Sequence, residues 1–541
     1  MARFEPDHPL LPDIVALHAR WQPAKPALIV DGETIGWADF DAATNRVANG
    51  LAGLGLGPGD MVAVAMRNGR AMVEVLFGIM KAGACSVPLN LSITDQAMAA
   101  MIRDCGAQAV FATDDQVPRI DAMAGDLPDA LLERRYLAGP ARDGWTDFGS
   151  WAAAQSDQPC SVPLVGDGPC NVIYSSGTTG MPKGIVHTHR GRRDWAYDCA
   201  VAFRYHGDAR TLCTIGLYSN IMWVAMLCTL LAGGTLVVHD KFDAARAVAD
   251  IAGLSITHTA MVPVQYQRIL EAGATQTDLA SLQSAITVGS KMHAVLKGRV
   301  LDLIPNALFE LYGLTEGIIT IQPPAEARLR PDSVGRPILG CDIKLVGDDD
   351  REVGPGAAGE IVSRARYVMP GYLNRPEATA EAQWTDAAGR RWLRTGDIGT
   401  LDADMNLSIV DRKKDMILSG GQNIYPADIE AVLLSHPQVG DAAVIGVESA
   451  RWGETPLAVV VLKAQAVQAG AVPKAVAIMD WLNARVGRQQ RVAGVELVDE
   501  LPRNPNGKVL KRELRARYGG DPGRRPLRAR SATRGIENDP P

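Results

Sequence analysis

The chain has 541 residues, of which 47% are hydrophobic and 21% charged, and its formal net charge is −6. This composition is typical of a globular chain too long for one hydrophobic core, so we expect two to four structural units. There is no global excess of basic residues to attract nucleic acid. The eight cysteines form no C-x-x-C pair and the nine histidines show no zinc-binding spacing, so we predict neither a disulfide framework nor a zinc site.

The N-terminal segment MARFEPDHPLLPDIV carries acidic residues and prolines where a secretory signal needs a basic start and an apolar core, which predicts a cytoplasmic protein. Farther along, residues 211–238 contain no charge and are long enough on paper to span a bilayer. Ser219, Asn220, Gly233 and Gly234 divide this stretch into a strand (TLCTI), a buried helix (IMWVAMLCTLLA) and a second strand (TLVV). We therefore predict no transmembrane segment, with a membrane span as the less favoured alternative.

Short apolar runs such as MVAVAM, QAVFAT and CNVIYS alternate with helical patterns such as RAMVEVLFGIMKAGA, which predicts stacked α/β layers. From residue 348 the segment DDDREVGPGAAGEIV is rich in turns and indicates a smaller β subdomain. The charge cluster DRKKD precedes a compact C-terminal domain, and a glycine-, proline- and arginine-rich end predicts a disordered tail. The predicted boundaries are 1–410 for the N-terminal domain, 411–415 for a hinge, 416–518 for the C-terminal domain and 519–541 for the tail.

The most chemically distinctive segment is YSSGTTGMPKG, from Tyr174 to Gly184. Its glycines permit close approach of backbone N–H groups, its hydroxyls add donors and Lys183 adds a positive charge, as in loops that bind phosphate. It is not a Walker A loop, because Lys183 follows Pro182 instead of the last glycine. A solvent-exposed connector is the alternative interpretation.

Four downstream clusters supply other groups that nucleotide chemistry needs. YGLTEG (312–317) combines an aromatic ring, a hydroxyl and a carboxylate that can stack a base, contact a phosphate and hold Mg²⁺. LRTGD (393–397) ends in a carboxylate that can accept hydrogen bonds from two ribose hydroxyls. DRKKD (411–415) opens the linker, and LPRNPNGKVLKREL (501–514) presents a lysine on a turn. Each cluster alone is also compatible with ordinary surface residues, but together they predict nucleotide chemistry.

In their order and approximate spacing, YSSGTTGMPKG, YGLTE, LRTGD, DRKKD followed by SGGQNIYP, and PNGKVLKREL resemble the motifs of the acyl-adenylating superfamily. This superfamily includes acyl-CoA synthetases, adenylation domains of peptide synthetases and beetle luciferases. The similarity runs from about Leu11 to Arg517. It implies an α/β fold with a large N-terminal domain of two α/β layers plus a β-barrel-like subdomain, followed by a small mobile C-terminal α+β domain.

The resemblance also implies a role for individual residues. Lys508 bridges the reacting carboxylate and the α-phosphate, Thr315 contacts the α-phosphate, and Glu316 holds Mg²⁺. The residues implied to bind ATP or AMP are Ser175, Ser176, Gly177, Thr178, Thr179, Gly180, Lys183, Tyr312, Gly313, Asp397 and Arg412. Those implied elsewhere are Lys414 at the hinge, Gly420 and Gly421 in the CoA tunnel, and Tyr218, Ser219, Asn220, Trp223, Gly289, Leu314 and Ile318 around the acyl pocket.

These roles imply a carboxylic acid–CoA ligase that uses ATP, Mg²⁺ and coenzyme A and passes through an acyl-AMP intermediate. Ser219 stands where many acyl-CoA synthetases have histidine, and VGSKMH (288–293) departs from the usual adenine-site loop. Because Gly313 replaces the tryptophan of acetate-using members, we expect medium-chain, cyclic or aryl acids to be preferred over acetate.

Three alternatives stay open: an enzyme that loads a free-standing carrier protein, a peptide-synthetase type, and a non-catalytic nucleotide-binding relative. We expect no nucleic-acid partner, and a homodimer is left open.

Overall fold

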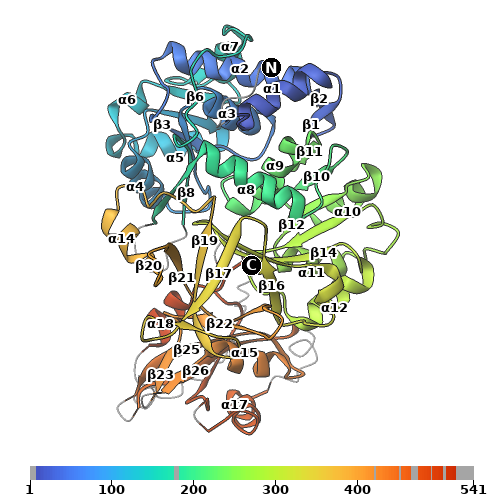
Figure 1. Cartoon of the computed structure of the whole chain (residues 1–541), viewed down its shortest axis with the longest axis vertical. Helices are drawn as coiled ribbons and strands as arrows, with labels where there is room; N and C mark the ends of the chain where they lie inside the picture. The colour runs from blue at the N-terminus through green and yellow to red at the C-terminus, as the bar shows by residue number, and fades with distance from the viewer. Residues whose placement is uncertain are drawn as a thin grey trace, which may run out of the picture. The chain divides into compact units, whose positions relative to one another are not determined.

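The computed structural model describes residues 8–175, 182–419, 422–449, 452–464, 473–488, 490–503 and 507–519. These residues form two compact units (Figure 1). The first contains residues up to Ile409 together with Gly507 and Lys508, and the second contains the described residues of 410–503 and 509–519. Of the predicted tail, 519–541, residues 520–541 lie outside the described residues, and the hinge boundaries stay a prediction.

A seven-stranded sheet forms one layer of the first unit. Its strand order is β7-β6-β5-β3-β4-β8-β9, and all neighbours are parallel except β8 and β9, which form an antiparallel pair. The strands are β3 (Met61–Ala65), β4 (Cys85–Pro88), β5 (Ala109–Thr113), β6 (Arg135–Ala138), β7 (Thr146–Asp147), β8 (Pro169–Tyr174) and β9 (Gly184–Thr188). The predicted phosphate loop follows the carboxyl end of β8, the edge of a parallel sheet where ligands usually bind.

The second sheet of this unit has more strands, and its strand pairing changes from parallel to antiparallel. Six neighbouring strands, β1, β11, β10, β12, β13 and β14, are parallel, and from β14 onward the pairs are antiparallel. The strands of the parallel part, with β2 at its edge, are β1 (Pro26–Val30), β2 (Glu33–Gly36), β10 (Arg210–Cys213), β11 (Thr235–Val238), β12 (His258–Met261), β13 (Ser284–Thr287) and β14 (Leu308–Leu314). Those of the antiparallel part are β15 (Ile318–Gln322), β16 (Ser333–Pro337), β17 (Cys341–Val346), β18 (Glu352–Val353), β19 (Ala358–Ala365), β20 (Gln383–Thr385), β21 (Arg391–Leu401) and β22 (Leu407–Arg412).

Helices cover these two sheets and bury their apolar strands, which confirms the predicted α/β layers (Figure 1). They are α1 (Leu11–Trp21), α2 (Trp37–Gly53), α3 (Arg70–Lys81), α4 (Asp95–Cys105), α5 (Val117–Ala122), α6 (Asp129–Leu132), α7 (Phe148–Ala153), α8 (His189–Ala202), α9 (Asn220–Ala232), α10 (Ala244–Gly253), α11 (Pro263–Glu271), α12 (Ala294–Leu303), α13 (Pro324–Ala327) and α14 (Pro376–Glu381).

The uncharged stretch 211–238 has the predicted strand–helix–strand order, as β10, α9 and β11. Nine of the thirteen residues of α9 are buried in the core, which explains why this helix is apolar on all sides. Across the described ranges, none of the helices is both long and apolar enough to cross a membrane.

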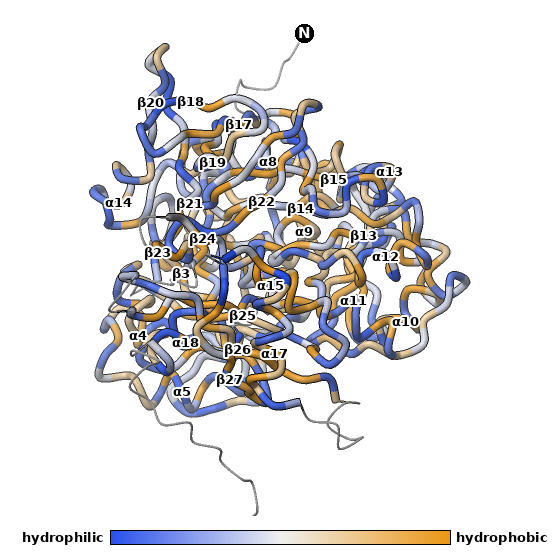
Figure 2. Tube along the Cα trace, turned by 90° about the horizontal axis from the view of Figure 1, so that it is seen from below, coloured by the Kyte–Doolittle hydropathy of each residue, from blue (hydrophilic) through white to orange (hydrophobic). Residues whose placement is uncertain are grey.

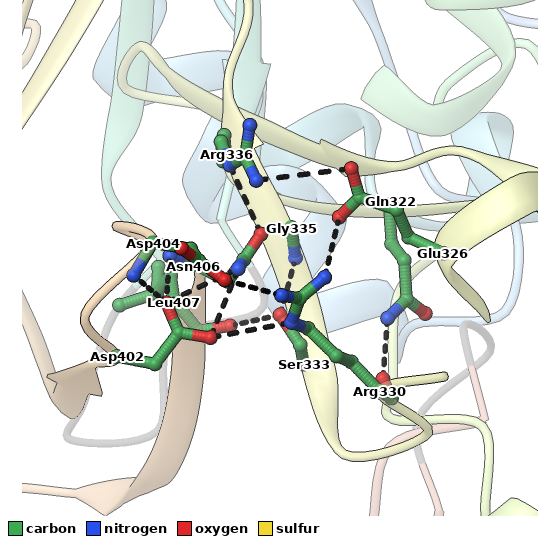
Figure 3. A network of polar contacts seen from close by, with 10 residues as sticks. All are labelled: Gln322, Glu326, Arg330, Ser333, Gly335, Arg336, Asp402, Asp404, Asn406 and Leu407. Carbon is green, nitrogen blue, oxygen red and sulfur yellow. Dashed lines mark hydrogen bonds and ion pairs between the residues drawn. The ribbon is translucent and has the colours of Figure 1, made fainter. Parts of the chain in front are cut away.

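A polar network fastens two turns of the antiparallel part to each other (Figure 3). Arg330, before β16, pairs with Asp404 in the turn between β21 and β22, and its Nε lies 3.4 Å from Asp402. On β16, Arg336 Nε donates to Asn406 Oδ1 at 3.0 Å, and Asn406 is bound in turn by Asp402. These bonds fix the turn after β21, the strand that carries Asp397, against β16 and the segment before it.

The second unit is built on a five-stranded sheet with helices beside it. The strand order is β24-β23-β26-β25, with β27 paired to β26, and hydrophobic residues run along β26 (Figure 2). Its elements are β23 (Ile417–Ser419), β24 (Gln422–Ile424), α15 (Pro426–Leu434), β25 (Val439–Ser449), β26 (Gly453–Leu462), α17 (Ala475–Asn483), β27 (Val495–Val498) and α18 (Lys511–Tyr518). A separate hydrophobic core of this unit agrees with a small α+β domain.

Candidate active site

Tyr312 and Asp397, which are 85 residues apart in sequence, meet in the structure. The Tyr312 hydroxyl donates to Asp397 Oδ2 at 2.8 Å. Asp397 is only 3% exposed, and its backbone N–H donates to Thr395 Oγ at 3.1 Å, while Gly396 has a φ of +71° that turns the strand locally. The residues predicted to contact adenine and ribose are therefore neighbours.

Glu316 lies in the turn of residues 315–317 that joins β14 to β15, and it is held from two sides. Its Oε1 accepts a hydrogen bond from the Tyr372 hydroxyl at 3.0 Å, and its carbonyl accepts one from Met369 N–H at 2.9 Å. The next residue must be glycine, because Gly317 has a φ of +127° and a Cβ atom there would lie 2.6 Å from the Cα of Val368.

Tyr372 also contacts the predicted phosphate-binding lysine. The Nζ atom of Lys183 lies 4.7 Å from the centre of the Tyr372 ring, a cation–π distance. Burial and the Glu316 carboxylate raise the pKa of Tyr372, so its hydroxyl stays protonated and donates to Glu316. One aromatic residue thus joins Lys183 to Glu316.

The two ends of the predicted phosphate loop are bonded to each other. Ser175 N–H donates to the Lys183 carbonyl at 2.9 Å, and Lys183 N–H donates to Ser175 Oγ at 3.3 Å. The predicted loop residues Ser176, Gly177, Thr178, Thr179 and Gly180 lie outside the described residues.

Asp104, near the end of α4, contacts the polypeptide on both sides of this loop. Its Oδ2 accepts from the Tyr174 hydroxyl at 2.8 Å, and its Oδ1 lies 2.7 Å from Arg375. The Asp104 carbonyl accepts from Asn374 Nδ2 at 2.7 Å, and the nearby Leu373 N–H donates to the Gly184 carbonyl at 2.7 Å. A carboxylate from a distant helix therefore positions the strand before the loop and the segment that contains Tyr372.

The other predicted catalytic and hinge residues have the following positions. Thr315 precedes Glu316 in the β14–β15 turn, and Lys508 follows Gly507, which has a φ of +78°. Arg412 ends β22 in the second unit, and Lys414 lies in the turn after it. Gly420 and Gly421 lie outside the described residues. The roles assigned to these residues stay predictions.

Three of the residues expected to form one acyl pocket lie in two different hydrophobic clusters. Trp223 is fully buried in the core between the α/β layers, where its Nε1 donates to the Leu217 carbonyl at 2.8 Å. Ile318 is packed in the core of the antiparallel part, and Leu314 lies against that same core. Gly289, with a φ of +91°, is exposed after β13.

At this predicted pocket, Ser219 occupies the N-cap position of α9, where its side chain makes no capping hydrogen bond. The space beside Gly313 is taken by backbone, because a Cβ atom there would lie 2.4 Å from the Ile318 carbonyl oxygen. Gly313 is required by close approach within the β14–β15 hairpin, and the inference that this glycine opens room for a larger acid was wrong.

Sequence reasoning did not single out Tyr372, Asp104 or Arg375. The segment YVMPGYLNRPEAT, which contains Tyr372 and Arg375, carries a glycine–tyrosine pair in a turn-rich region, but nothing in it indicates a partner 56 residues away. Asp104 resembles any acidic residue near the end of an amphipathic helix.

Comparison with known proteins shows the family of the chain. The model of the AMP-binding enzyme family matches residues 15–373, and the model of its C-terminal domain matches residues 428–508. The chain belongs to the AMP-binding enzyme family. It is 35% identical to a feruloyl-CoA synthase from Amycolatopsis sp over 93% of this chain and 97% of that protein, and 32% identical to a fatty acid–[acyl-carrier-protein] ligase from Streptomyces coeruleorubidus over 96% and 99%.

A solved structure, ATP-bound MatB from Rhodopseudomonas palustris, superposes with a TM-score of 0.84 at 28% identity, over 93% of this chain and 99% of that one. These similarities confirm the fold class and the resemblance to acyl-adenylating enzymes. The chain is an AMP-forming acid–thiol ligase of this family.

The geometry at Glu316 fits the magnesium ion that such chemistry implies. Glu316 is partly exposed, and its Oε1 accepts a hydrogen bond from the Tyr372 hydroxyl. Magnesium in nucleotide sites commonly takes one or two carboxylates and completes its shell with phosphate oxygens and water. The Glu316 carboxylate would therefore hold Mg²⁺, while Tyr372 fixes its orientation.

Proposed function

We propose that the protein is an ATP-dependent carboxylic acid–CoA ligase that forms an acyl-AMP intermediate and then an acyl-CoA thioester. The observation that carries the proposal is the arrangement of Tyr312 with Asp397 and of Lys183 with Tyr372 and Glu316. These two groups supply a ring for a base, a carboxylate for a ribose, a cation for phosphate and a carboxylate for Mg²⁺. Together they match the parts of an ATP molecule.

In the proposed first step an oxygen of the acid attacks the α-phosphorus in line, a P–O bond to pyrophosphate breaks, and the mixed anhydride with AMP forms. Two anions must come together, so cationic groups have to offset their repulsion. Lys183 supports the departing phosphates, and Lys508 would bridge the carboxylate and the α-phosphate. Bound Mg²⁺ would neutralise part of the triphosphate charge.

In the second step a thiol attacks the acyl carbonyl, the C–O bond to AMP breaks, and the thioester forms. The thiol proton leaves with AMP or solvent. We assign the thiol to coenzyme A, and the hinge at Lys414 and the segment at Gly420 and Gly421 would serve this half-reaction.

For the acid we propose a medium-chain, cyclic or aryl carboxylic acid in preference to acetate. Support comes from the feruloyl-CoA synthase among the relatives and from the aromatic residues Tyr218 and Trp223 in and before α9. Apolar burial favours larger acids by about 0.8 kcal/mol per methylene.

The test is pyrophosphate release with acetate, octanoate, cyclohexanecarboxylate, benzoate and 4-coumarate, each measured with and without CoA. We expect kcat/KM for at least one of the larger acids to exceed that for acetate by about a hundredfold or more. A preference for acetate would reject the proposed acid class, and no release with any acid would reject the ligase assignment.

A carrier protein is the second candidate for the acceptor, because one of the relatives is a fatty acid–[acyl-carrier-protein] ligase. Stoichiometric acyl-CoA formation would favour coenzyme A. Acyl-AMP that accumulates with CoA present, and disappears only when a phosphopantetheinylated carrier protein is added, would favour the carrier.

A further inference from the structure

An arginine is buried against two tryptophans of the largest hydrophobic core, and the described residues give it no carboxylate partner. Arg192, on α8, is 2% exposed and lies between two indole rings, with its guanidinium carbon 4.7 Å from the Trp195 ring centre and 5.0 Å from that of Trp223. Its Nε donates to Asn171 Oδ1 at 2.8 Å. Among the described residues, the titratable groups that influence its charge are two cysteines, and no carboxylate is among them. Buried charges in proteins are normally paired, so this cation requires an explanation.

Neighbouring thiols do not provide the missing negative charge. Cys170 and Cys199 are close enough to influence Arg192 electrostatically. Burial raises the pKa of Cys170 to about 12 and that of Cys199 well above its usual value, so both thiols are protonated at neutral pH. Burial lowers the pKa of Arg192 to about 9, which still leaves the guanidinium charged at pH 7.

Two other buried polar side chains lie beside Arg192, and both have an unused nitrogen. Asn171 on β8 and His187 on β9 are directly paired across the antiparallel ladder, so their side chains share one face of the sheet. The atoms Arg192 Nη2, Asn171 Nδ2 and His187 Nε2 are all buried and make no hydrogen bond. His187 stays neutral because burial lowers its pKa, and its Nε2 can carry a proton and donate.

We propose that Arg192, Asn171 and His187 form a buried binding site for an anionic or strongly hydrogen-bond-accepting oxygen group. An acceptor would satisfy the three unused donors at once, and a negative charge would compensate the guanidinium, which a neutral water molecule cannot do. Two sources share this chemistry: the far end of the acid substrate, and a small free anion such as formate or chloride.

The structure favours the acid substrate as the source. Arg192 stacks on Trp223, which belongs to α9, and α9 begins at the residues assigned to the acyl pocket. This part of the inference rests on the proposed function. An acid with a second oxygen group at its far end would then extend toward the cluster, so the preferred substrate class would be dicarboxylic or hydroxyl-bearing acids of medium length.

The experiment compares the full-length wild-type protein with Arg192→Met, which removes the charge and retains an apolar side chain. In the substrate arm, kcat/KM is measured for octanoate against octanedioate and for 3-phenylpropanoate against 3-(4-hydroxyphenyl)propanoate. We expect the wild type to favour the second acid of at least one pair by about tenfold, and Arg192→Met to lose that preference while it still converts the first acid.

In the free-anion arm, thermal unfolding at pH 7.5 is followed in formate, chloride and gluconate of equal ionic strength. If a small anion is the source, formate or chloride raises the Tm of the wild type by about 2 °C or more over gluconate, and Arg192→Met abolishes the difference. Arg190→Met is the matched control, because it removes a partly exposed arginine two residues away on the same helix, one that pairs with Asp167 at 3.2 Å. It should behave as the wild type in both arms.

A second variant keeps the test decisive if Arg192→Met does not fold. Asn171→Leu removes one donor and the bond to Arg192 Nε, so it should weaken whichever effect the wild type shows. The proposal is overturned if the wild type shows neither an acid preference of this kind nor a specific anion effect. If no acid supports pyrophosphate release, the proposed ligase function is rejected. The free-anion arm then still tests whether Arg192, Asn171 and His187 bind an anion.

Discussion

Among individual residues, Tyr372 makes two contacts of the candidate site, a hydrogen bond to Glu316 and a ring contact with Lys183. Tyr372→Phe removes only the first. We expect a five- to tenfold loss of kcat/KM for ATP, about 1 kcal/mol, and a higher Mg²⁺ concentration for half-maximal rate, because Glu316 loses the bond that orients it. Pyrophosphate release over a Mg²⁺ titration measures both. Tyr372→Leu should lose more, and an unchanged Mg²⁺ dependence in the Phe variant would contradict the role.

Lys508 is predicted to act in one half-reaction only. Lys508→Ala should lower acyl-AMP formation by about a hundredfold or more, a typical loss for one transition-state charge contact. Thioester formation from supplied acyl-AMP should survive. Single-turnover assays of the two half-reactions provide the measurement, with Arg512→Ala, an exposed position four residues later in the sequence, as a comparison. Equal losses in both halves would show that the lysine is structural.

How much of the candidate site could be predicted from the sequence depends on whether a residue's partners lie close to it in the chain. Tyr312, Glu316 and Asp397 could be predicted as site residues because each stands in a compact motif whose chemistry is visible locally, and their roles stay predictions. Tyr372, Asp104 and Arg192 could not, because their roles depend on partners 56, 70 and 21 residues away that only the fold brings close. Gly313 was misinterpreted for the same reason, since its neighbour is a backbone carbonyl across a hairpin.

At the scale of elements, the β14–β15 hairpin determines where Glu316 lies. Gly317→Ala would place a Cβ atom 2.6 Å from the Val368 Cα in a backbone conformation that alanine disfavours. We expect the turn to shift, the Met369–Glu316 bond to weaken, and adenylation to fall by about thirtyfold or more with a lower Tm. Gly298→Ala, on α12 where a Cβ meets nothing within 4 Å, is the control and should retain activity.

Lys414 lies in the predicted hinge segment, 411–415. Lys414→Pro fixes φ near −65° and removes a backbone donor, so it should restrict rotation there. We expect adenylation to persist while thiol transfer collapses. The measurement is the rate of each half-reaction, with Lys414→Ala as the variant that changes the side chain alone. A full overall rate in the proline variant would rule out a hinge at this residue.

The elements also show why the fold was easier to predict than the site. Apolar runs such as MVAVAM and TLCTI became β3 and β10 to within two residues, because burial on both faces demands an apolar pattern. The pairing of β15 with β16, which joins the antiparallel part to the large sheet, follows from long-range register and leaves no comparable pattern in the sequence.

For the whole molecule, buried histidines predict how stability depends on pH. Burial lowers the pKa of His189 and His258 to about 4, below the 6.5 of an exposed histidine. The unfolded chain therefore binds more protons than the folded one between pH 6.5 and 4, and the stability these residues contribute above pH 6.5 is lost as the pH falls through this window. We expect Tm to fall by several degrees between pH 7.5 and 5.5.

Thermal unfolding in a pH series provides the measurement. The His258 and Tyr205 ring centres lie 4.1 Å apart, and His258→Phe retains a ring there. This variant should make the dependence of Tm on pH shallower. A Tm independent of pH across this window would show that these imidazoles do not limit acid stability.

Within the second unit, both ends of the predicted hinge segment, 411–415, are bonded to neighbouring residues. Asp411 accepts from Ala427 N–H at 3.0 Å, and Asp415 lies 2.6 Å from Arg515 on α18, whose first residue, Lys511, pairs with Glu430. Helix α18, the last of the described helices, is therefore bonded directly to the predicted hinge segment. Truncation of the chain before Lys511 would remove the partner of Asp415 and leave the predicted hinge segment bonded at Asp411 only, so we expect thiol transfer to fall more than adenylation.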